Sequence, residues 1–232
     1  MFWELEESAA LRASAAGTPT LEKEAWLAAM LSAYGTCGFN ITSADNFASG
    51  NPRAYATLLY CPASEAPGCA RLPTAPLTSD AYVLTSLHCD PNMVGSGLET
   101  MLLDAAIVHL ARQGIKALEA FARDESFCDD PFHPQPENIQ RIVNSAEEIG
   151  LMTVELLESA GFEIIRHHPV LPLLRLHLPP EHALLTVEAI EPLLANVKEN
   201  HHGKFRACPV LASLRTCTCL WADHHHRGDI SA

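Results

Sequence analysis

The hydrophobic pattern in the middle of the chain predicts a strand, a helix and a second strand. Residues 81–89 are rich in apolar, aromatic and β-branched side chains and stop at Asp90-Pro91. Over residues 98–113 apolar side chains recur at helical spacing, and Gly114 follows them. Residues 115–121 again have the composition of a strand. A helical crossover between two strands implies that they lie parallel or splay apart.

The residues before this unit predict a helix and a hairpin. Thr18-Pro19 has the form of a cap followed by proline at the first helical position, and Gly35 ends the apolar stretch that follows. Two short apolar segments, residues 37–41 and 54–60, are separated by turn-forming residues and predict an antiparallel pair. Several prolines in residues 62–80 predict a loop.

The residues after the unit predict one long helix and two further strands. Asn144, with a glutamate three residues later, has the form of a helix cap, and the helix is expected to run to Gly161. Residues 162–166 and 173–178 are expected to be strands. Residues 181–197 predict a terminal helix that is interrupted by a proline.

Length and charge limit the possible functions. The chain has 232 residues, for which we expect one α/β domain over residues 1–198 and a tail over residues 199–232. Its 15 basic and 28 acidic side chains give a net charge of −13, which disfavours nucleic acid and anionic membrane surfaces. The same charge favours a cationic substrate such as an amine. An anionic cofactor would then need local dipoles for binding.

The N-terminal residues and the cysteines point to the cytoplasm. The first eight residues are acidic and have no apolar leader, and no apolar segment approaches the roughly 18 residues that a membrane span requires. The eight cysteines form no Cys-x-x-Cys pair, so most are expected to be small buried hydrophobic residues.

The turn between residues 91 and 98 is the strongest candidate site. A strand, a glycine-bearing turn and a helix together form an anion site, because the first helical turn leaves N–H groups free and adds a partial positive charge. Gly95 and Gly97 would let the backbone approach phosphate oxygens closely. The alternative is an ordinary tight turn.

Two segments resemble motifs of the GCN5-related N-acetyltransferase (GNAT) superfamily. Residues 87–98, Leu-His-Cys-Asp-Pro-Asn-Met-Val-Gly-Ser-Gly-Leu, resemble its acetyl-CoA motif, Arg/Gln-x-x-Gly-x-Gly/Ala. Residues 156–162, Leu-Leu-Glu-Ser-Ala-Gly-Phe, resemble its last core helix and the Gly-Phe that leads into the next strand. The resemblance covers about residues 55–178.

This resemblance implies a fold and an activity. The expected fold is α/β (α+β), with a mixed, mostly antiparallel sheet of six or seven strands, splayed at its centre and flanked by helices on both faces. The implied activity is acetyl transfer from acetyl-CoA, as co-substrate, to a primary amine by direct attack in a ternary complex. Polyamine, aminoglycoside-like amine, amino acid and protein N-terminus all stay open as acceptors. Members are often dimers, so a homodimer is compatible with the resemblance.

The resemblance also places the cofactor. The main chain of Leu87 and Cys89 would contact the pantetheine arm. The turn would bind the pyrophosphate through Asn92, Met93, Val94, Gly95, Ser96, Gly97 and Leu98. Asn92 stands where the motif usually has Arg or Gln. Leu157 stands where many members have the tyrosine that protonates the leaving thiolate.

An attacking amine must first lose a proton, so a carboxylate or imidazole is expected nearby. Glu119, on the second central strand, is the first candidate for the catalytic base, His88 the second and Asp90 the third. Each has a structural alternative, because a strand carboxylate is usually solvated or paired and a histidine beside a buried strand usually packs.

Two alternatives come from other classes of protein. The chain could bind acyl-CoA without transferring the acyl group, which the leucine at position 157 favours. The tail could instead form a metal-binding module through its potential ligands, which are His201, His202, Cys208, Cys217, Cys219 and residues 224–226. The Cys217-x-Cys219 spacing does not match a zinc knuckle, so no metal site is predicted.

Overall fold

The computed structural model describes residues 2–43, 54–126, 135–180 and 205–209, and every statement below refers to these residues. The expected terminal helix over residues 181–197 and most of the tail lie outside them. The figures draw the remaining residues in grey.

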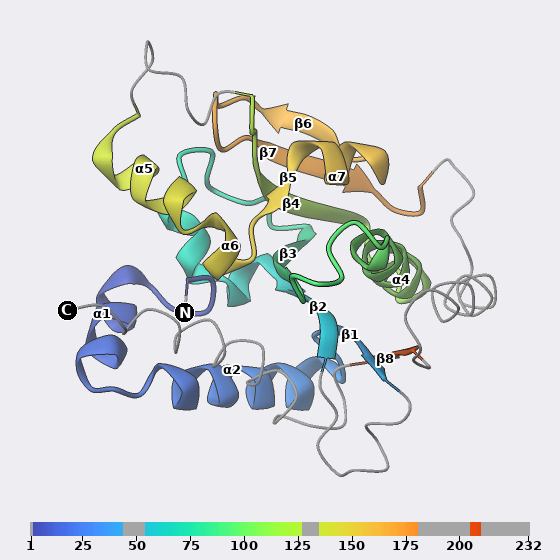
Figure 1. The fold of residues 1–232 in the computed structure, drawn as a ribbon, viewed down its shortest axis with the longest axis horizontal. Coiled ribbons are helices and arrows are strands. Elements are labelled where there is room, and N and C mark those ends of the chain that lie inside the picture. The colour runs from blue at the N-terminus through green and yellow to red at the C-terminus, as the bar shows by residue number, and fades with distance from the viewer. Residues whose placement is uncertain (1, 44–53, 127–134, 181–204, 210–232) are drawn as a thin grey trace.

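A mixed sheet forms the centre of the molecule (Figure 1). Its path is β6-β7-β4-β3-β2-β1-β8, and β5 pairs with β4 off this path. The β3–β4 and β4–β5 pairs are parallel, and the other pairs are antiparallel. The strands are β1 (Gly38–Ser43), β2 (Ala54–Pro62), β3 (Ala81–Cys89), β4 (Ala117–Arg123), β5 (Met152–Thr153), β6 (Glu163–Arg166), β7 (Leu173–His177) and β8 (Phe205–Pro209).

Helices cover both faces of this sheet. On one face, α4 packs on the sheet through apolar side chains such as Leu102 and Ile107, and α7 packs through Leu157. On the other face, α2 and α5 pack through Leu27 and Ile142. The helices are α1 (Glu7–Ala15), α2 (Pro19–Tyr34), α4 (Leu98–Arg112), α5 (Glu137–Asn144), α6 (Ala146–Ile149) and α7 (Val154–Ser159), with short 3₁₀ helices η1 (Ala63–Glu65) and η2 (Pro67–Arg71). The expected fold class, a mixed and mostly antiparallel sheet between helices, is confirmed.

Most of the predicted elements up to β4 are present. Pro19 begins α2, and Gly35 ends it with a left-handed φ of 76°. β1 and β2 form the predicted antiparallel pair, and β3 has the predicted bounds. The elements that were not predicted are α1, α5, β5, β8 and the two 3₁₀ helices. The buried Cys37, Cys61 and Cys69 occupy the apolar cluster, as expected of small hydrophobic residues.

The prediction of one long helix from Asn144 to Gly161 is wrong. Asn144 is the last residue of α5, and α6 ends at Ile149, followed by the cap residue Gly150, which has a left-handed φ of 70°. β5 follows, and α7 begins only after Thr153, whose hydroxyl accepts a hydrogen bond from the Leu156 amide. The break arises because the Gly150 carbonyl bonds to β3 instead of continuing a helix.

The strand β8 lies beyond the boundary predicted for the domain. Residues 205–209, which the sequence assigned to a tail, pair antiparallel with β1. The sheet therefore includes part of the predicted tail, and the division at residue 198 stays a prediction.

The central strands β3 and β4 diverge. They pair from Ala81 opposite Ala117 to Leu84 opposite Ala120, and β3 then continues to Cys89 without pairing to β4. A register shift opposite Leu59–Tyr60 marks the point at which β3 changes course. The divergence opens the carboxyl end of the sheet beside the glycine turn.

Candidate functional site

A cleft of about 800 Å³ lies at this open end of the sheet. The last residues of β3, the glycine turn and the first turn of α4 line one side of it. Gly150, β5 and the start of α7 line the other side. Its size is within the range of small-molecule sites.

Asp90 builds the turn that carries the two glycines. Its buried carboxylate accepts hydrogen bonds from the Asn92 amide at 3.0 Å and from the Asn92 side chain at 2.9 Å. Its carbonyl accepts from the Met93 amide at 2.7 Å. The third candidate for the base therefore has a structural role in shaping the turn.

The glycines leave the surface of the turn open. Gly95 and Gly97 have φ values of 76° and 82°, which other residues adopt only with strain. No heavy atom lies within 4 Å of the place where a Cβ would stand on either glycine. A ligand can therefore approach the backbone here.

The turn still has free hydrogen-bond donors. The Met93 and Ser96 amides donate within the turn, the second to the Met93 carbonyl. In the described part of the chain, the amides of Val94, Gly95, Gly97 and Leu98 meet no acceptor. These four amides and the dipole of the 15-residue helix α4 form a set of donors suited to an anion.

The edge of β3 that faces the gap is half occupied. Backbone groups of alternate residues point to opposite sides of a strand. The Asp90 amide donates to Tyr55 on the β2 side, so Leu87 and Cys89 present their backbone groups to the gap. The Leu87 amide donates to the Gly150 carbonyl at 2.8 Å, which leaves the Leu87 carbonyl and the Cys89 amide for a ligand.

The mixed, mostly antiparallel sheet, the divergence of its two central parallel strands and the glycine turn at the start of α4 together match the architecture that the motif resemblance implied. The fold is GNAT-like.

Solved structures with a similar fold include several acetyltransferases. The ribosomal-protein-S18-alanine N-acetyltransferase of Escherichia coli is 16% identical, with 56% of this chain and 64% of that chain covered at a TM-score of 0.31. The yncA protein of Salmonella typhimurium, solved with acetyl-CoA, is 16% identical, with 58% and 63% covered at a TM-score of 0.31. The ribosomal-protein-S5-alanine acetyltransferase of Vibrio fischeri is 11% identical, with 78% and 81% covered at a TM-score of 0.40.

The identities and TM-scores of these structures are low, and they assign no activity to this chain. The chain spans less than two thirds of the length of the Escherichia coli and Salmonella proteins. No protein-family model matches the sequence, and no curated protein sequence matches it.

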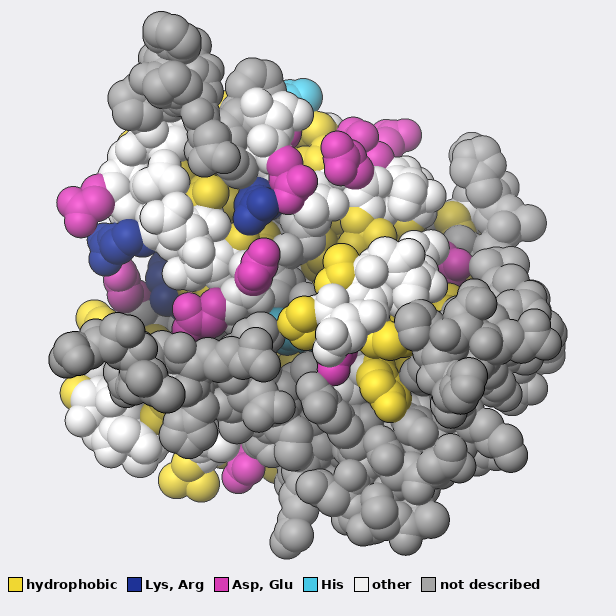
Figure 2. Space-filling view, viewed as in Figure 1, with side chains coloured by type: hydrophobic (Ala, Val, Ile, Leu, Met, Phe, Trp, Pro, Cys, Tyr) yellow, Lys and Arg dark blue, Asp and Glu magenta, His cyan; other side chains and the backbone are white. Residues whose placement is uncertain are grey.

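The cleft of this GNAT-like fold is acidic. Glu99, Glu125 and Glu147 line it, and Arg123, its one lining arginine among the described residues, is paired with Glu125 at 2.6 Å. Figure 2 shows acidic side chains spread over the face of the molecule that it draws, with few basic ones among them. The cleft therefore suits a cationic amine. An anionic diphosphate could bind here only through the free amides of the turn.

The thiol of Cys89 is held in its protonated form. Burial raises its pKa to about 12, and the nearby carboxylates of Glu99, which also accepts its hydrogen bond, and Asp90 add to the shift. A protonated thiol is a poor nucleophile, so Cys89 is not suited to covalent catalysis.

His88, the second candidate for the base, lines the cleft. It lies on β3 between the two residues whose backbone faces the gap, and its ring lies against the backbone of Gly150. The geometry keeps His88 as the candidate for proton transfer.

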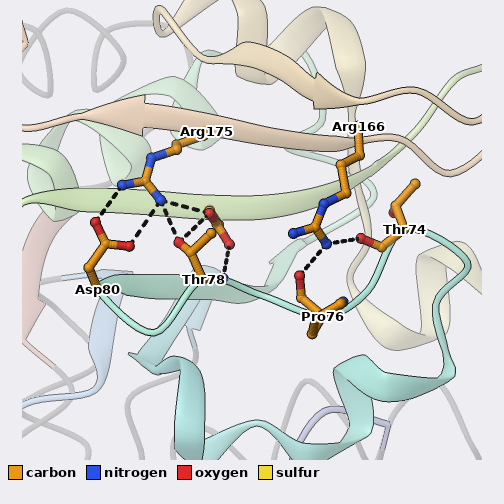
Figure 3. Close-up of polar contacts among 7 residues, drawn as sticks. Thr74, Pro76, Thr78, Asp80, Arg166 and Arg175 are labelled. Atoms are coloured by element: carbon orange, nitrogen blue, oxygen red, sulfur yellow. Dashed lines mark hydrogen bonds and ion pairs between the residues drawn. The ribbon is translucent and has the colours of Figure 1, made fainter.

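Glu119, the first candidate for the base, lies away from the cleft. Its fully buried carboxylate accepts hydrogen bonds from the Thr78 hydroxyl at 2.6 Å, the Thr78 amide at 2.9 Å and Arg175 at 2.8 Å. Figure 3 shows Arg175 reaching from β7 to Asp80 and Thr78. Hydrogen bonds with Arg175, with Thr78 and with the backbone of Asp80 itself lower the pKa of the Asp80 carboxyl group to about 2. This network fastens the loop before β3, so Glu119 has a structural role.

The position of the family's tyrosine holds a core residue. Leu157 is completely buried in α7. No tyrosine is among the described residues that line the cleft. Among the described residues no cluster of three metal ligands occurs, and no helix is long and apolar enough to cross a bilayer.

Proposed function

We propose that this protein is an N-acetyltransferase that moves an acetyl group from acetyl-CoA to a primary amine. The observation that carries the proposal is the set of free amides on the glycine turn, at the mouth of a cleft where two parallel strands diverge. A cytoplasmic location and a homodimer stay predictions.

The cofactor would bind as an extended molecule. Its diphosphate would accept hydrogen bonds from the amides of Val94, Gly95, Gly97 and Leu98. Its pantetheine arm would run along the β3 edge and pair with the Cys89 amide and the Leu87 carbonyl. Asn92, Met93 and Ser96 would shape the turn, because their amides already donate within it.

The reaction needs one proton acceptor and one proton donor. His88 would take a proton from the acceptor ammonium, directly or through a water, and leave a neutral amine. The amine nitrogen attacks the thioester carbon, the carbon–sulfur bond breaks, and the nitrogen loses its second proton to solvent as the amide forms. The released thiolate takes a proton from solvent, because Leu157 replaces the family's tyrosine. The acidic lining would hold the acceptor in place.

A CoA-release assay with a panel of amines tests the proposal. At least one cationic amine should release CoA, and His88→Gln should lower kcat by about 100-fold or more, the usual worth of a general base. His177→Gln, at the exposed end of β7, is the matched control and should change little. No CoA release with any polyamine, aminoglycoside, amino acid or peptide would reject the transferase.

A second function, acyl-CoA binding without transfer, has specific support. Gly150 occupies the Leu87 amide, and Leu157 replaces the tyrosine of many family members. On this account acetyl-CoA raises the thermal midpoint but no amine releases CoA.

A further inference from the structure

The segment from Ile149 to Thr153 crosses the gap between β3 and β4. The Ile149 carbonyl accepts a hydrogen bond from the ring nitrogen of the buried Trp3 at 2.7 Å. The Gly150 carbonyl accepts from the Leu87 amide at 2.8 Å. Met152, which is 3% exposed, and Thr153 pair in parallel with β4. The segment thus joins the two strands where they would otherwise stand apart.

Gly150 makes the closest approach in this segment. A Cβ at this position would stand 2.8 Å from the Ser86 Cβ and 2.9 Å from two ring atoms of His88. Its φ of 70° adds a second reason for glycine. The backbone of Gly150 therefore lies directly on the side chains of β3.

From these contacts we infer that residues 149–153 form the end wall of the donor cleft and that Gly150 determines which acyl thioesters can enter. This inference rests on the proposed function. A ligand arm running along β3 toward its start meets Gly150 at the level of Leu87, because the amide there is already bonded. The thioester carbonyl therefore stops beside His88. The acyl group fits in the space in front of Gly150 and cannot pass between β3 and β4.

The wall is a fixed part of the fold. A mobile lid has few buried contacts. This segment has bonds to Trp3 and Leu87, strand pairing with β4 and a buried Met152 in the main core. The site therefore takes short acyl groups and discriminates against long ones.

A series of acyl donors tests the wall. Dissociation constants for acetyl-, butyryl- and octanoyl-CoA, measured by calorimetry, should not improve with chain length. In an open gap each buried methylene would tighten binding by about fourfold. Affinity that rises steadily from acetyl- to octanoyl-CoA would overturn the inference.

A substitution at Gly150 tests its role directly. Gly150→Ala should push the wall and the facing edge of β3 apart and weaken acetyl-CoA binding by about tenfold, the loss expected when one hydrogen bond between β3 and the pantetheine arm is misaligned. Gly35→Ala is the matched control, because Gly35 also ends a helix, has a φ of 76° and has no atom within 4 Å of a Cβ. Adding Ser86→Gly to Gly150→Ala removes the closest clashing atom and should restore binding. Unchanged affinity of Gly150→Ala for acetyl-CoA would contradict the inference. If this variant does not fold, the series of acyl donors measured with the wild type tests the inference instead.

A nucleotide without the pantetheine arm separates the two proposals. Adenosine 3′-phosphate 5′-diphosphate carries the diphosphate of CoA but no pantetheine arm. It reaches only the glycine turn, so Gly150→Ala should leave its binding unchanged. Binding of this nucleotide with no effect of Gly150→Ala on acetyl-CoA rejects the wall alone. Absence of binding by every nucleotide and every acyl-CoA rejects the proposed function and the wall with it.

Discussion

Glu99 is a residue that we expect to oppose cofactor binding. It lies in the first turn of α4, lines the cleft and accepts a hydrogen bond from the Cys89 thiol. A carboxylate at a helix N-terminus is itself stabilised by the free amides and the dipole. It therefore competes with the diphosphate that the same amides are proposed to bind.

Replacing this carboxylate by an amide should strengthen binding. Glu99→Gln is expected to tighten acetyl-CoA binding by about two- to fivefold, which corresponds to the usual worth of a charge at a helix end. Glu22→Gln, in the first turn of α2, makes the same change of charge away from the cleft. Titration calorimetry of both variants checks this, and weaker binding by Glu99→Gln would show that the carboxylate helps the ligand.

Arg175 is expected to matter for stability. Arg175→Met leaves the fully buried Glu119 carboxylate without its cation and should lower the free energy of unfolding by about 3–5 kcal/mol. Combining it with Glu119→Gln should recover part of that loss, because no buried charge is then left unpaired. Urea unfolding measures both, and a loss below about 1 kcal/mol would mean that solvent screens the pair.

At the scale of elements, the segment from α5 to α7 decides the shape of the cleft. Gly150 ends α6, β5 pairs with β4, and Thr153 caps α7. A continuous helix over these residues would remove the bond to Leu87 and with it the end wall of the cleft.

The cap of α7 gives an independent check on this break. Thr153→Ala should lower the free energy of unfolding by about 1 kcal/mol, because the Leu156 amide loses its acceptor. Thr153→Ser keeps the hydroxyl and should retain most of the stability. Equal stability of the alanine and serine variants in urea would contradict the cap.

The predictions that succeeded depended on local signals. The bounds of β3, the start of α2 at Pro19 and the turn at Gly95 and Gly97 follow from residues close together in the sequence. The glycine at position 150 was itself a signal for a helix end. The apolar spacing continues on both sides of Gly150, so the sequence predicted one helix through it.

Contacts between residues far apart in the sequence could not be predicted. The carboxylate of Glu119, the first candidate for the base, accepts hydrogen bonds from Thr78 and Arg175, which lie far from it in the sequence. The Leu87 amide, part of the main chain expected to contact the pantetheine arm, donates to the Gly150 carbonyl. Nothing in the spacing of the sequence indicates either contact.

At the scale of the whole molecule, a buried ion pair fastens the N-terminal segment. Glu4 is 3% exposed and pairs with Lys23 of α2. Burial raises the pKa of Glu4, but the charge of Lys23 and hydrogen bonds outweigh it, so the pKa lies below its ordinary value. The pair therefore stabilises the fold only while Glu4 is ionised.

This ion pair predicts how stability depends on pH. Because the folded pKa of Glu4 is depressed, its contribution is present above the ordinary value and is lost as the pH falls through the folded pKa. In Lys23→Met the buried carboxylate is unpaired, so stability should instead fall as the pH rises through its raised pKa. Urea unfolding midpoints of the wild type and of Lys23→Met, measured between about pH 3 and pH 7, check this. The same pH dependence in both proteins would contradict it.

The central claim is that the glycine turn binds the diphosphate of acetyl-CoA, and a thermal-shift titration of two glycine variants tests it most directly. Gly95→Glu places a side chain and a negative charge on the free amides, and Gly114→Glu introduces the same residue at a matched φ of 78° beyond the far end of α4. Acetyl-CoA should raise the midpoint of the wild type and of Gly114→Glu, because it binds only the folded state, and should leave Gly95→Glu unchanged. An equal shift in all three proteins would contradict the account.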